Sequence, residues 1–479
     1  MKKSYSISNI IVGLLLMSTL VLIVLGAFHC KKCDPLKPYH YYYNPNTLTQ
    51  ENYSIEILGH RLYNAYLNRN VRNLDYSNNF LYPDSMITDI VELLSHELFG
   101  NTHSESKSSE RSTDSVDDLR RDILKFLGTS ISKYTVIFTY SNGQALKAFI
   151  EAFPFNSSST FAYSSSSHND ILGLRYLAQK KSSALKSFKF NTIDQDLSSL
   201  SSTCPNLAVF PLLDLFDGTI LTNDEMKKAL SISNIYTLAD ASHYLMSRRL
   251  NLTELPFSAV TLSFEHLFGY PKLGVLVLNN DLVDKLQKPY FGGGTLVYAL
   301  PSKDVVKMRL RPSERYEDGS LPFLNIAAVS SGFKLMETLK WENVHDHIKN
   351  MTKKVIQILN EEGKYSDGTK GVVIYGDKQE SIVSFNIIDK TSQKVVQFDK
   401  YFNIARRNNV RIAVGCHQTP GTCLKALNID ESTLYDKVST LNMSSYGSLR
   451  VSVGWATIES DIDFFRQLIK FYFRDENVK

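Results

Sequence analysis

Three things that this chain of 479 residues lacks narrow what it can be. Its five cysteines are too few to form the disulfide framework of a small secreted protein. It lacks a charge bias, because 53 Lys and Arg residues nearly balance 49 Asp and Glu residues. The resulting net charge of +4 gives no reason to expect nucleic acid as a partner. It also lacks the polar composition of a disordered chain, since 43% of its residues are hydrophobic.

One long apolar run lies near the N-terminus. Ile10 to Phe28 comprises 19 residues without a charged side chain. A helix rises about 1.5 Å per residue, so this run is long enough to cross the hydrocarbon core of a bilayer. We therefore expect a membrane anchor within residues 1–34, followed by a linker over residues 35–51. A cleaved signal peptide is the alternative, and the balanced lysines on both sides of the run leave the membrane and the orientation open.

The rest of the chain alternates amphipathic helical segments with short apolar runs. Residues 115–127 place apolar side chains on one helical face, and residues 135–140, TVIFTY, are typical of a buried strand. This alternation predicts a mostly parallel sheet with helices on both faces. We expect a large α/β domain over residues 52–314 and a smaller C-terminal domain over residues 315–479.

Polar residues follow several of the expected strands. In open α/β sheets, ligands bind beyond the carboxyl ends of the strands, so these residues are candidates for a site. They are Ser141, Asn142 and Gly143 after TVIFTY, then His168, Asp240, Ser263 and the Gly-rich run that ends at Thr295. Each one alone has a simpler explanation as a helix cap, a loop residue or a structural histidine.

Their order along the chain is more informative than any single residue. The succession FTYSNGQALK, SSSHNDILGLR, LADASHY, SFEHLFGYP, YFGGGT and RYEDGSLPFL resembles the class V aminotransferases. Within that fold it is most similar to the cysteine-desulfurase-like domain of molybdenum cofactor sulfurases, over about Leu74 to Phe473. The resemblance implies fold type I of the transferases that depend on pyridoxal phosphate (PLP). It also implies a sheet of the seven-stranded type, a smaller α+β domain, and a homodimer.

Family roles are carried over only where the motifs match. The resemblance assigns cofactor contacts to Ser141, Asn142, Gly143, His168, Asp240, His243, Ser263 and Thr295. Asp240 would pair with the pyridine nitrogen of PLP, and Thr295 would reach the phosphate in the partner subunit. Arg450 would bind a substrate carboxylate, because its planar fork suits two oxygens.

Other positions depart from the family pattern. His266 stands where the family has the lysine that forms a Schiff base, and imidazole cannot form an imine. Leu215 replaces an asparagine, Ala413 an arginine, and Gln418 a cysteine, while Cys416 remains a catalytic candidate. We expect a degenerate enzyme that acts as a binding or scaffold module for an unknown small molecule. PLP, if bound, would be non-covalent.

Two alternatives remain open at this point. An enzyme of altered mechanism would use His266 as a base toward unattached pyridoxal or pyridoxamine phosphate, with Lys272 as a substitute amine. An ordinary sulfurase with a shifted alignment is less favoured, because the frame SFEHLFGYP matches the family without a gap. The stretch FEHLFGYP itself is expected to form a loop between two buried strands.

Overall fold

The computed structural model describes residues 71–78, 80–181, 183–200, 203–432 and 446–474. The predicted anchor and linker, residues 1–51, lie outside these ranges, and the anchor therefore stays a prediction. Among the described helices, none combines the length and the apolar character needed to cross a bilayer.

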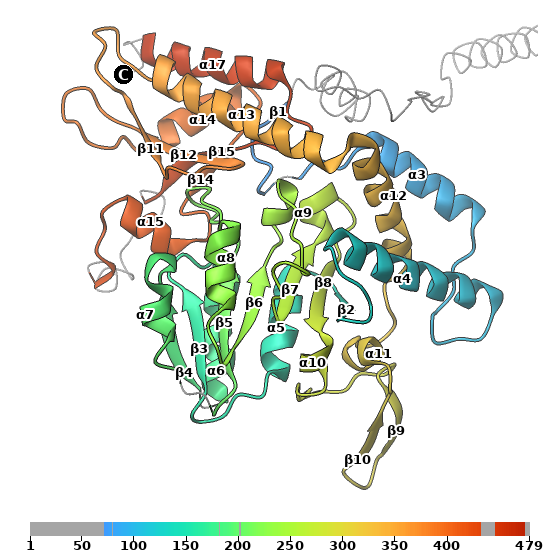
Figure 1. Ribbon diagram of the computed structural model, residues 1–479. Helices are drawn as coiled ribbons and strands as arrows, with labels where there is room; N and C mark the ends of the chain where they lie inside the picture. The colour runs from blue at the N-terminus through green and yellow to red at the C-terminus, as the bar shows by residue number, and fades with distance from the viewer. Residues whose placement is uncertain (1–70, 79, 182, 201–202, 433–445, 475–479) are drawn as a thin grey trace, which may run out of the picture. The chain divides into compact units, whose positions relative to one another are not determined.

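The larger sheet has seven strands in the order β2-β8-β7-β6-β5-β3-β4 (Figure 1). Its strands are β2 (Tyr134–Thr139), β3 (Thr160–Ser164), β4 (Ala184–Phe188), β5 (Asn206–Pro211), β6 (Ile235–Asp240), β7 (Ala259–Ser263) and β8 (Gly274–Asn279). Only β8 runs against the others, because it pairs antiparallel with both β2 and β7. The predicted mostly parallel, seven-stranded sheet is therefore confirmed.

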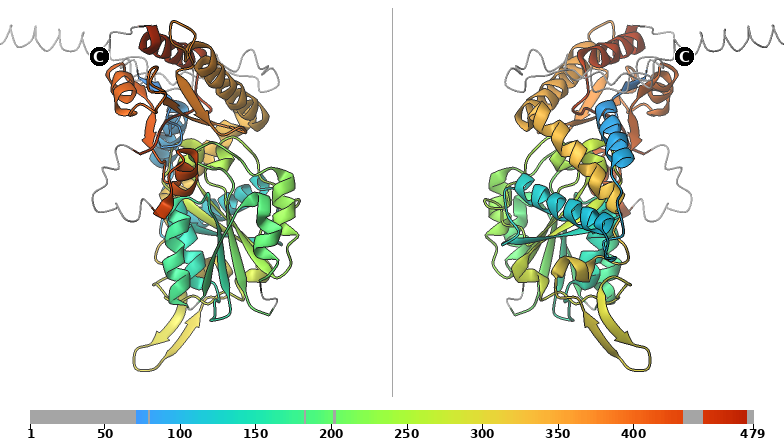
Figure 2. Two further views of the ribbon diagram at one scale, coloured as in Figure 1. Left: turned by 90° about the vertical axis from the view of Figure 1, so that its left-hand side faces the viewer. Right: turned by 90° about the vertical axis from the view of Figure 1, so that its right-hand side faces the viewer.

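Both faces of this sheet are buried, and strand periodicity divides their side chains between two cores. Ile137 of β2 packs in the core beneath α5 (Asn142–Ala152) and α6 (Asn169–Lys180). Its neighbours Val136 and Phe138 point the other way, into the core shared with the helices of the opposite face. Figure 2 shows the sheet between these helix layers. Each fully buried Leu or Phe contributes about 1.5–3 kcal/mol, which holds the layers together.

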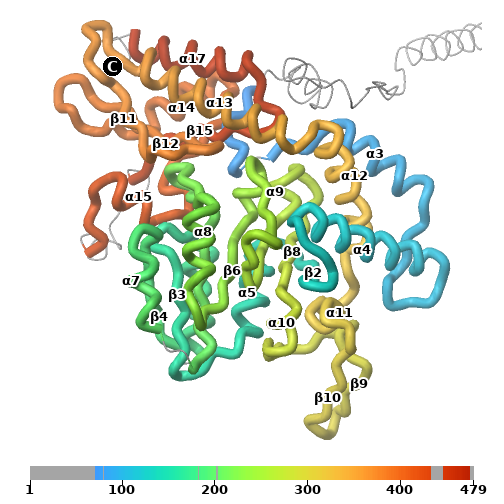
Figure 3. Tube along the Cα trace, viewed as in Figure 1, coloured from blue at the N-terminus to red at the C-terminus, as the bar shows by residue number. Residues whose placement is uncertain are grey.

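Further helices and shorter elements complete the part of the fold that contains the seven-stranded sheet. They are α3 (Asp84–His96), α4 (Lys107–Phe126), α7 (Ile193–Leu197), α8 (Asn223–Leu230), α9 (Phe264–Phe268), α10 (Asn280–Val283), α11 (Pro312–Tyr316) and α12 (Phe323–Leu339), with 3-10 turns η3 (Phe190–Thr192) and η4 (Tyr244–Met246). A hairpin of β9 (Leu296–Leu300) and β10 (Val305–Met308) extends from the base of the sheet (Figure 3).

A smaller antiparallel sheet, in the order β11-β12-β15-β14, forms the C-terminal part. Its strands are β11 (Val372–Tyr375), β12 (Ile382–Ile387), β14 (Ala413–Gly415) and β15 (Ser448–Ser452), and its helices are α13 (Trp341–Glu362), α14 (Asp399–Arg407), α15 (Pro420–Ala426) and α17 (Glu459–Arg474). A short parallel pair joins β1 (Arg72–Asn73) to β13 (Val410–Arg411), so the start of the described chain lies against the C-terminal part. The predicted α+β character is confirmed, while the boundary at residue 315 stays a prediction.

Two local expectations were wrong. The helix expected over residues 115–127 already begins at Lys107, because the Ser106 hydroxyl caps it by accepting the backbone N–H of Ser109. The stretch FEHLFGYP is not all loop, since Phe264–Phe268 form the short helix α9. Phe264 and Phe268, the aromatic residues of α9, are buried, and their packing fixes this short helix. Gly269 ends the helix in the left-handed conformation, with φ of 76°.

The RYEDGSLPFL motif has a structural function in this chain. Both carboxylate oxygens of Glu317 accept hydrogen bonds from Arg120 at 2.6 Å, and one also accepts the backbone N–H of Phe138 at 2.9 Å. Glu317 is only 5% exposed. Because Arg120 lies on α4 and Phe138 on β2, this buried carboxylate ties a covering helix to the sheet.

We predict that Glu317→Ala lowers the free energy of unfolding by about 3–5 kcal/mol, because it leaves the Arg120 charge buried without its partner. Urea denaturation followed by circular dichroism measures the change. Glu314→Ala is the matched control, since the Glu314 carboxylate is partly exposed and lies 3.8 Å from Arg309. Equal effects of the two substitutions would contradict a structural function for Glu317.

Candidate functional site

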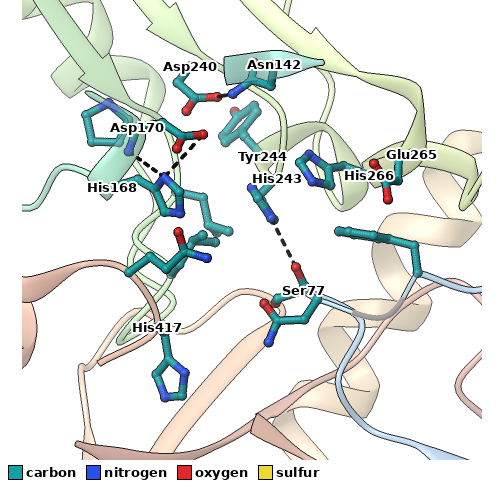
Figure 4. A pocket seen from close by; sticks show the side chains of 16 residues that line it. Ser77, Asn142, His168, Asp170, Asp240, His243, Tyr244, Glu265, His266 and His417 are labelled. Atoms are coloured by element: carbon teal, nitrogen blue, oxygen red, sulfur yellow. Dashed lines mark hydrogen bonds and ion pairs between the residues drawn. The ribbon is translucent and has the colours of Figure 1, made fainter. Parts of the chain in front are cut away.

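A cavity of about 270 Å³ opens at the carboxyl ends of the parallel strands. Asn142, His168, Asp240, His243 and His266, all predicted from the sequence, line it (Figure 4). They come from the N-terminal ends of α5 and α6, from α9, and, for Asp240 and His243, from the end of β6 and the turn that follows it. The expectation that strand ends would gather the candidate residues holds for these five.

Two of the four histidines that line the cavity, His243 and His266, lie ring against ring at an interplanar angle of 30°. The ring centroids of His243 and His266 are 4.1 Å apart, and the Phe80 centroid lies 4.6 Å from that of His266 and 6.0 Å from that of His243. His243 Nε2 lies 3.2 Å from the carbonyl oxygen of Ser77, whereas Nδ1 of His266 has no hydrogen-bond partner among the described residues. Burial lowers the pKa of His266 to about 3 and that of His243 well below its ordinary value. Both rings are therefore neutral at neutral pH.

Asp240 is held at the end of β6 by two donors. Its Oδ1 accepts hydrogen bonds from the Asn142 side chain at 3.1 Å and from the backbone N–H of Ser242 at 3.2 Å. Burial raises the pKa of Asp240, and the nearby His168 opposes that rise. The carboxylate thus faces the cavity with its orientation already fixed.

Three predicted residues lie at the cavity's margin without lining it. The Ser141 hydroxyl caps α5 by accepting the N–H of Gln144 at 3.2 Å. Gly143 is at the same helix end, and Ser263 is buried at the start of α9. Thr295 is also buried, and its hydroxyl donates to the carbonyl oxygen of Gly292 at 2.8 Å. Thr295 does not line the cavity of its own chain.

Arg450 does not line the cavity either. It is 1% exposed on β15, where its guanidinium donates to the carbonyl oxygen of Leu215 at 2.9 Å and pairs with Asp75 at 3.4 Å. Burial lowers the pKa of Arg450, and the Asp75 charge opposes that effect. The guanidinium is therefore engaged within the protein and is not directed at a ligand.

The loop around Cys416 is closed by a disulfide to Cys423, with the two Cα atoms 5.3 Å apart. Gln418 of this loop lines the cavity together with His417. The Thr422 hydroxyl donates to Asp214, whose pKa burial raises to about 7. These contacts fasten the loop against the larger sheet.

Several lining residues were missed by sequence reasoning. Ser77 and Phe80 reach the cavity from the N-terminal segment, and Asp170 and Glu265 reach it from α6 and α9. Asp170 and Glu265 stand beside predicted residues, so proximity in sequence could have found them. No local pattern marks Ser77 or Phe80, because the fold brings them to the site from a distant part of the chain.

Solved structures share this arrangement of sheets. The apo structure of a cysteine desulfurase from Thermococcus onnurineus NA1 superposes with a TM-score of 0.71 at 17% identity, covering 85% of this chain and 96% of that one. A C-DES mutant with glycine covalently linked to its PLP cofactor superposes with a TM-score of 0.64 at 12% identity, covering 84% and 97%. At these identities the likeness shows the fold, which is that of the cysteine desulfurases.

Sequence comparison then places the chain more narrowly. The family described as aminotransferase class-V matches residues 73–465, and the chain belongs to that family. Molybdenum cofactor sulfurase from Bos taurus is 29% identical over 439 residues, which cover 83% of this chain and 49% of the relative. The corresponding protein from Arabidopsis thaliana is 28% identical, covering 84% and 56%. The chain thus spans about half the length of the curated relatives it matches.

The residues present do not fit the family's covalently held PLP. Position 266 offers a neutral imidazole in place of a primary amine. Asp170 Oδ2 would lie 3.3 Å from a Cβ on Gly143, so a carboxylate already stands at the N-terminus of α5, where the resemblance puts the phosphate. Glu265, a second carboxylate, lines the cavity next to His266.

We predict that acid destabilises the protein through His266. The His266 side chain takes up a proton near pH 6.5 in the unfolded chain but only near pH 3 in the folded protein. The free energy of unfolding therefore falls as the pH drops from 6.5 toward 3. Each pH unit in this window costs up to about 1.4 kcal/mol for one such histidine. Urea denaturation at pH 7, 6, 5 and 4 should show a shallower decline for His266→Gln. The exposed-site control His96→Gln should keep the wild-type decline, and identical curves for all three proteins would contradict the assignment.

Proposed function

We propose that this class V family member has lost desulfurase chemistry and functions as a binding module for a small molecule. The observation that supports the proposal most strongly is His266, a neutral ring with an unpartnered Nδ1 at the place where the resemblance puts the catalytic lysine. Without a primary amine at this place, the imine on which the family's chemistry depends cannot form.

The alternative of an altered mechanism has weaker support. A base that works at neutral pH needs a pKa near neutrality, whereas burial lowers the pKa of His266 to about 3. Lys272, the other amine considered, is exposed and does not line the cavity. Neither residue therefore offers a replacement for the missing lysine.

The residues around the cavity support the same proposal. Arg450 is engaged by Asp75 and by the carbonyl oxygen of Leu215, so it does not offer its fork to a substrate carboxylate. Cys416 is bonded to Cys423, and Gln418 stands where the resemblance expects a further cysteine. Sulfur transfer needs a free thiolate near the substrate, and this loop offers none among the described residues.

We predict that the full-length protein incubated with PLP and borohydride yields no pyridoxyl peptide and releases no sulfur from cysteine. His266→Lys should trap pyridoxal, the phosphate-free aldehyde, on the peptide that contains position 266, because a primary amine is restored there. Peptide mass spectrometry measures both results. His266→Gln is the control without an amine. A pyridoxyl adduct on Lys272 in the unmutated protein, or sulfur release from it, would overturn the proposal.

We also propose that the module is a homodimer, as the resemblance implies for the YFGGGT motif. The hairpin β9–β10 that follows this motif supports the proposal, because it leaves apolar side chains exposed. These are Val297, Tyr298, Leu300, Val305 and Val306, which are 58%, 49%, 43%, 40% and 38% exposed. A second copy of the chain would remove them from water.

Light scattering of the full-length protein at micromolar concentration should give the mass of a dimer. Tyr298→Asp should weaken the dimer by at least about tenfold, because it puts a charge into an apolar contact. Tyr176→Asp, at an exposed tyrosine on α6, is the matched control and should leave the dimer intact. A monomeric unmutated protein would refute this proposal.

A further inference from the structure

Among the described residues that line the cavity, the charged residue types other than histidine are all acidic. Asp170, Asp240 and Glu265 contribute three carboxylates, and no Lys or Arg is among the described residues that line it. Figure 4 shows these carboxylates entering from three separate elements: α6, the end of β6, and α9. A cleft lined by one sign of charge raises the local concentration of ligands of the opposite sign.

Asp170 stands where an anion would otherwise bind. The N-terminus of an α-helix attracts anions through its free N–H groups and its dipole, and α5 is an 11-residue helix that starts at the cavity. The Asp170 carboxylate lies beside Gly143 in the first turn of α5, with Oδ2 3.3 Å from the position of a Cβ on that glycine. The chain therefore supplies its own anion here, and a phosphate would be repelled.

The histidines do little to offset these carboxylates. Burial lowers the pKa values of His243, His266 and His417, so their rings are neutral at neutral pH. The Nδ1 of His168 accepts the backbone N–H of Asp170 at 3.1 Å, which leaves only Nε2 to face a ligand. Besides the histidines, the acidic and basic side chains among the described residues that line the cavity are all acidic.

Buried acceptors in the cavity wall lack donors. Asn142 Oδ1 and Ser77 Oγ have no hydrogen-bond partner among the described residues, although their side chains belong to residues that are 8% and 3% exposed. His266 Nδ1 is unpartnered as well. A buried polar atom without a partner costs about 1–3 kcal/mol, so a ligand with N–H donors would recover that energy.

Aromatic side chains form part of the cavity wall. The Phe80 ring lies 4.6 Å from His266 and lines the cavity together with Tyr244. Aromatic faces attract organic cations, by about 0.5–2 kcal/mol depending on how completely the cation is desolvated. Arg450 is engaged with Asp75, and the described residues that line the cavity include no Lys or Arg that could pair with a ligand carboxylate.

We propose that the cavity binds a small organic amine as its ammonium cation, and that it discriminates against ligands that carry phosphate or carboxylate. The proposal rests on the proposed function in one respect, namely that the cavity is a binding site without covalent chemistry. The carboxylates would pair with the ammonium group, the unpartnered acceptors would take its N–H donors, and the aromatic wall would contact its apolar part.

Four probes of one shape test the proposal on the full-length protein. Benzylamine carries a cation, benzyl alcohol is neutral, benzyl phosphate is an anion, and phenylalanine adds a carboxylate to the amine. Isothermal titration calorimetry at pH 7 should rank benzylamine at least about tenfold tighter than each of the other three, as expected for one unscreened charge contact. Equal or tighter binding of benzyl phosphate, or no binding of any probe, would overturn the proposal.

Variants separate recognition from folding. Asp170→Asn and Glu265→Gln should each lower the affinity for benzylamine by about tenfold. Asp170→Asn should also raise the affinity for benzyl phosphate, because it frees the N-terminus of α5. Asp281→Asn, at an exposed position on α10, is the matched control and should change neither affinity. A folding defect would lower the affinity for both probes. A gain in affinity for benzyl phosphate therefore distinguishes a change in recognition from a folding defect. Unchanged benzylamine affinity in both variants would refute the proposal. The proposed loss of covalent chemistry is tested separately, by borohydride trapping.

Discussion

The cavity depends on one buried ion pair that joins distant parts of the chain. Arg450 of β15 pairs with Asp75 across 375 residues of sequence and donates to the carbonyl oxygen of Leu215 near the end of β5. This contact holds the N-terminal segment between the two sheets, which brings Ser77 and Phe80 to His243 and His266. An arginine that the resemblance assigns to a substrate carboxylate is thus used to build the wall of the site.

The chemistry of the cavity follows from which groups remain charged once they are buried. Desolvation keeps His243 and His266 neutral, so the rings act as flat surfaces with acceptor nitrogens. The described residues that line the cavity add the carboxylates of Asp170 and Glu265 and no Lys or Arg. We infer a ligand preference that differs from the family's, because the Asp170 carboxylate lies beside Gly143, where the resemblance puts the phosphate, and position 266 lacks a primary amine.

Local patterns in the sequence were sufficient for the fold and for part of the site. Short apolar runs between amphipathic helical segments predicted the buried strands, and residues at strand ends such as Asp240 and His168 were found because parallel strands share one carboxyl edge. The partner of Arg450 and the contribution of Phe80 could not be predicted, since both arise from contacts far apart in sequence. Cys416 was predicted as a catalytic candidate, and its bond to Cys423, seven residues on, is seen only in the structure. Only the tertiary structure revealed the carboxylate of Asp170 beside Gly143.

A crystal structure of the protein soaked with millimolar PLP tests the central claim most directly. The account predicts continuous density for the His266 ring without any covalent attachment, the Asp170 carboxylate still beside Gly143, and no phosphate at the N-terminus of α5. A PLP ring seated between His168 and Asp240, with its phosphate bound at Ser141 to Gly143, would contradict it.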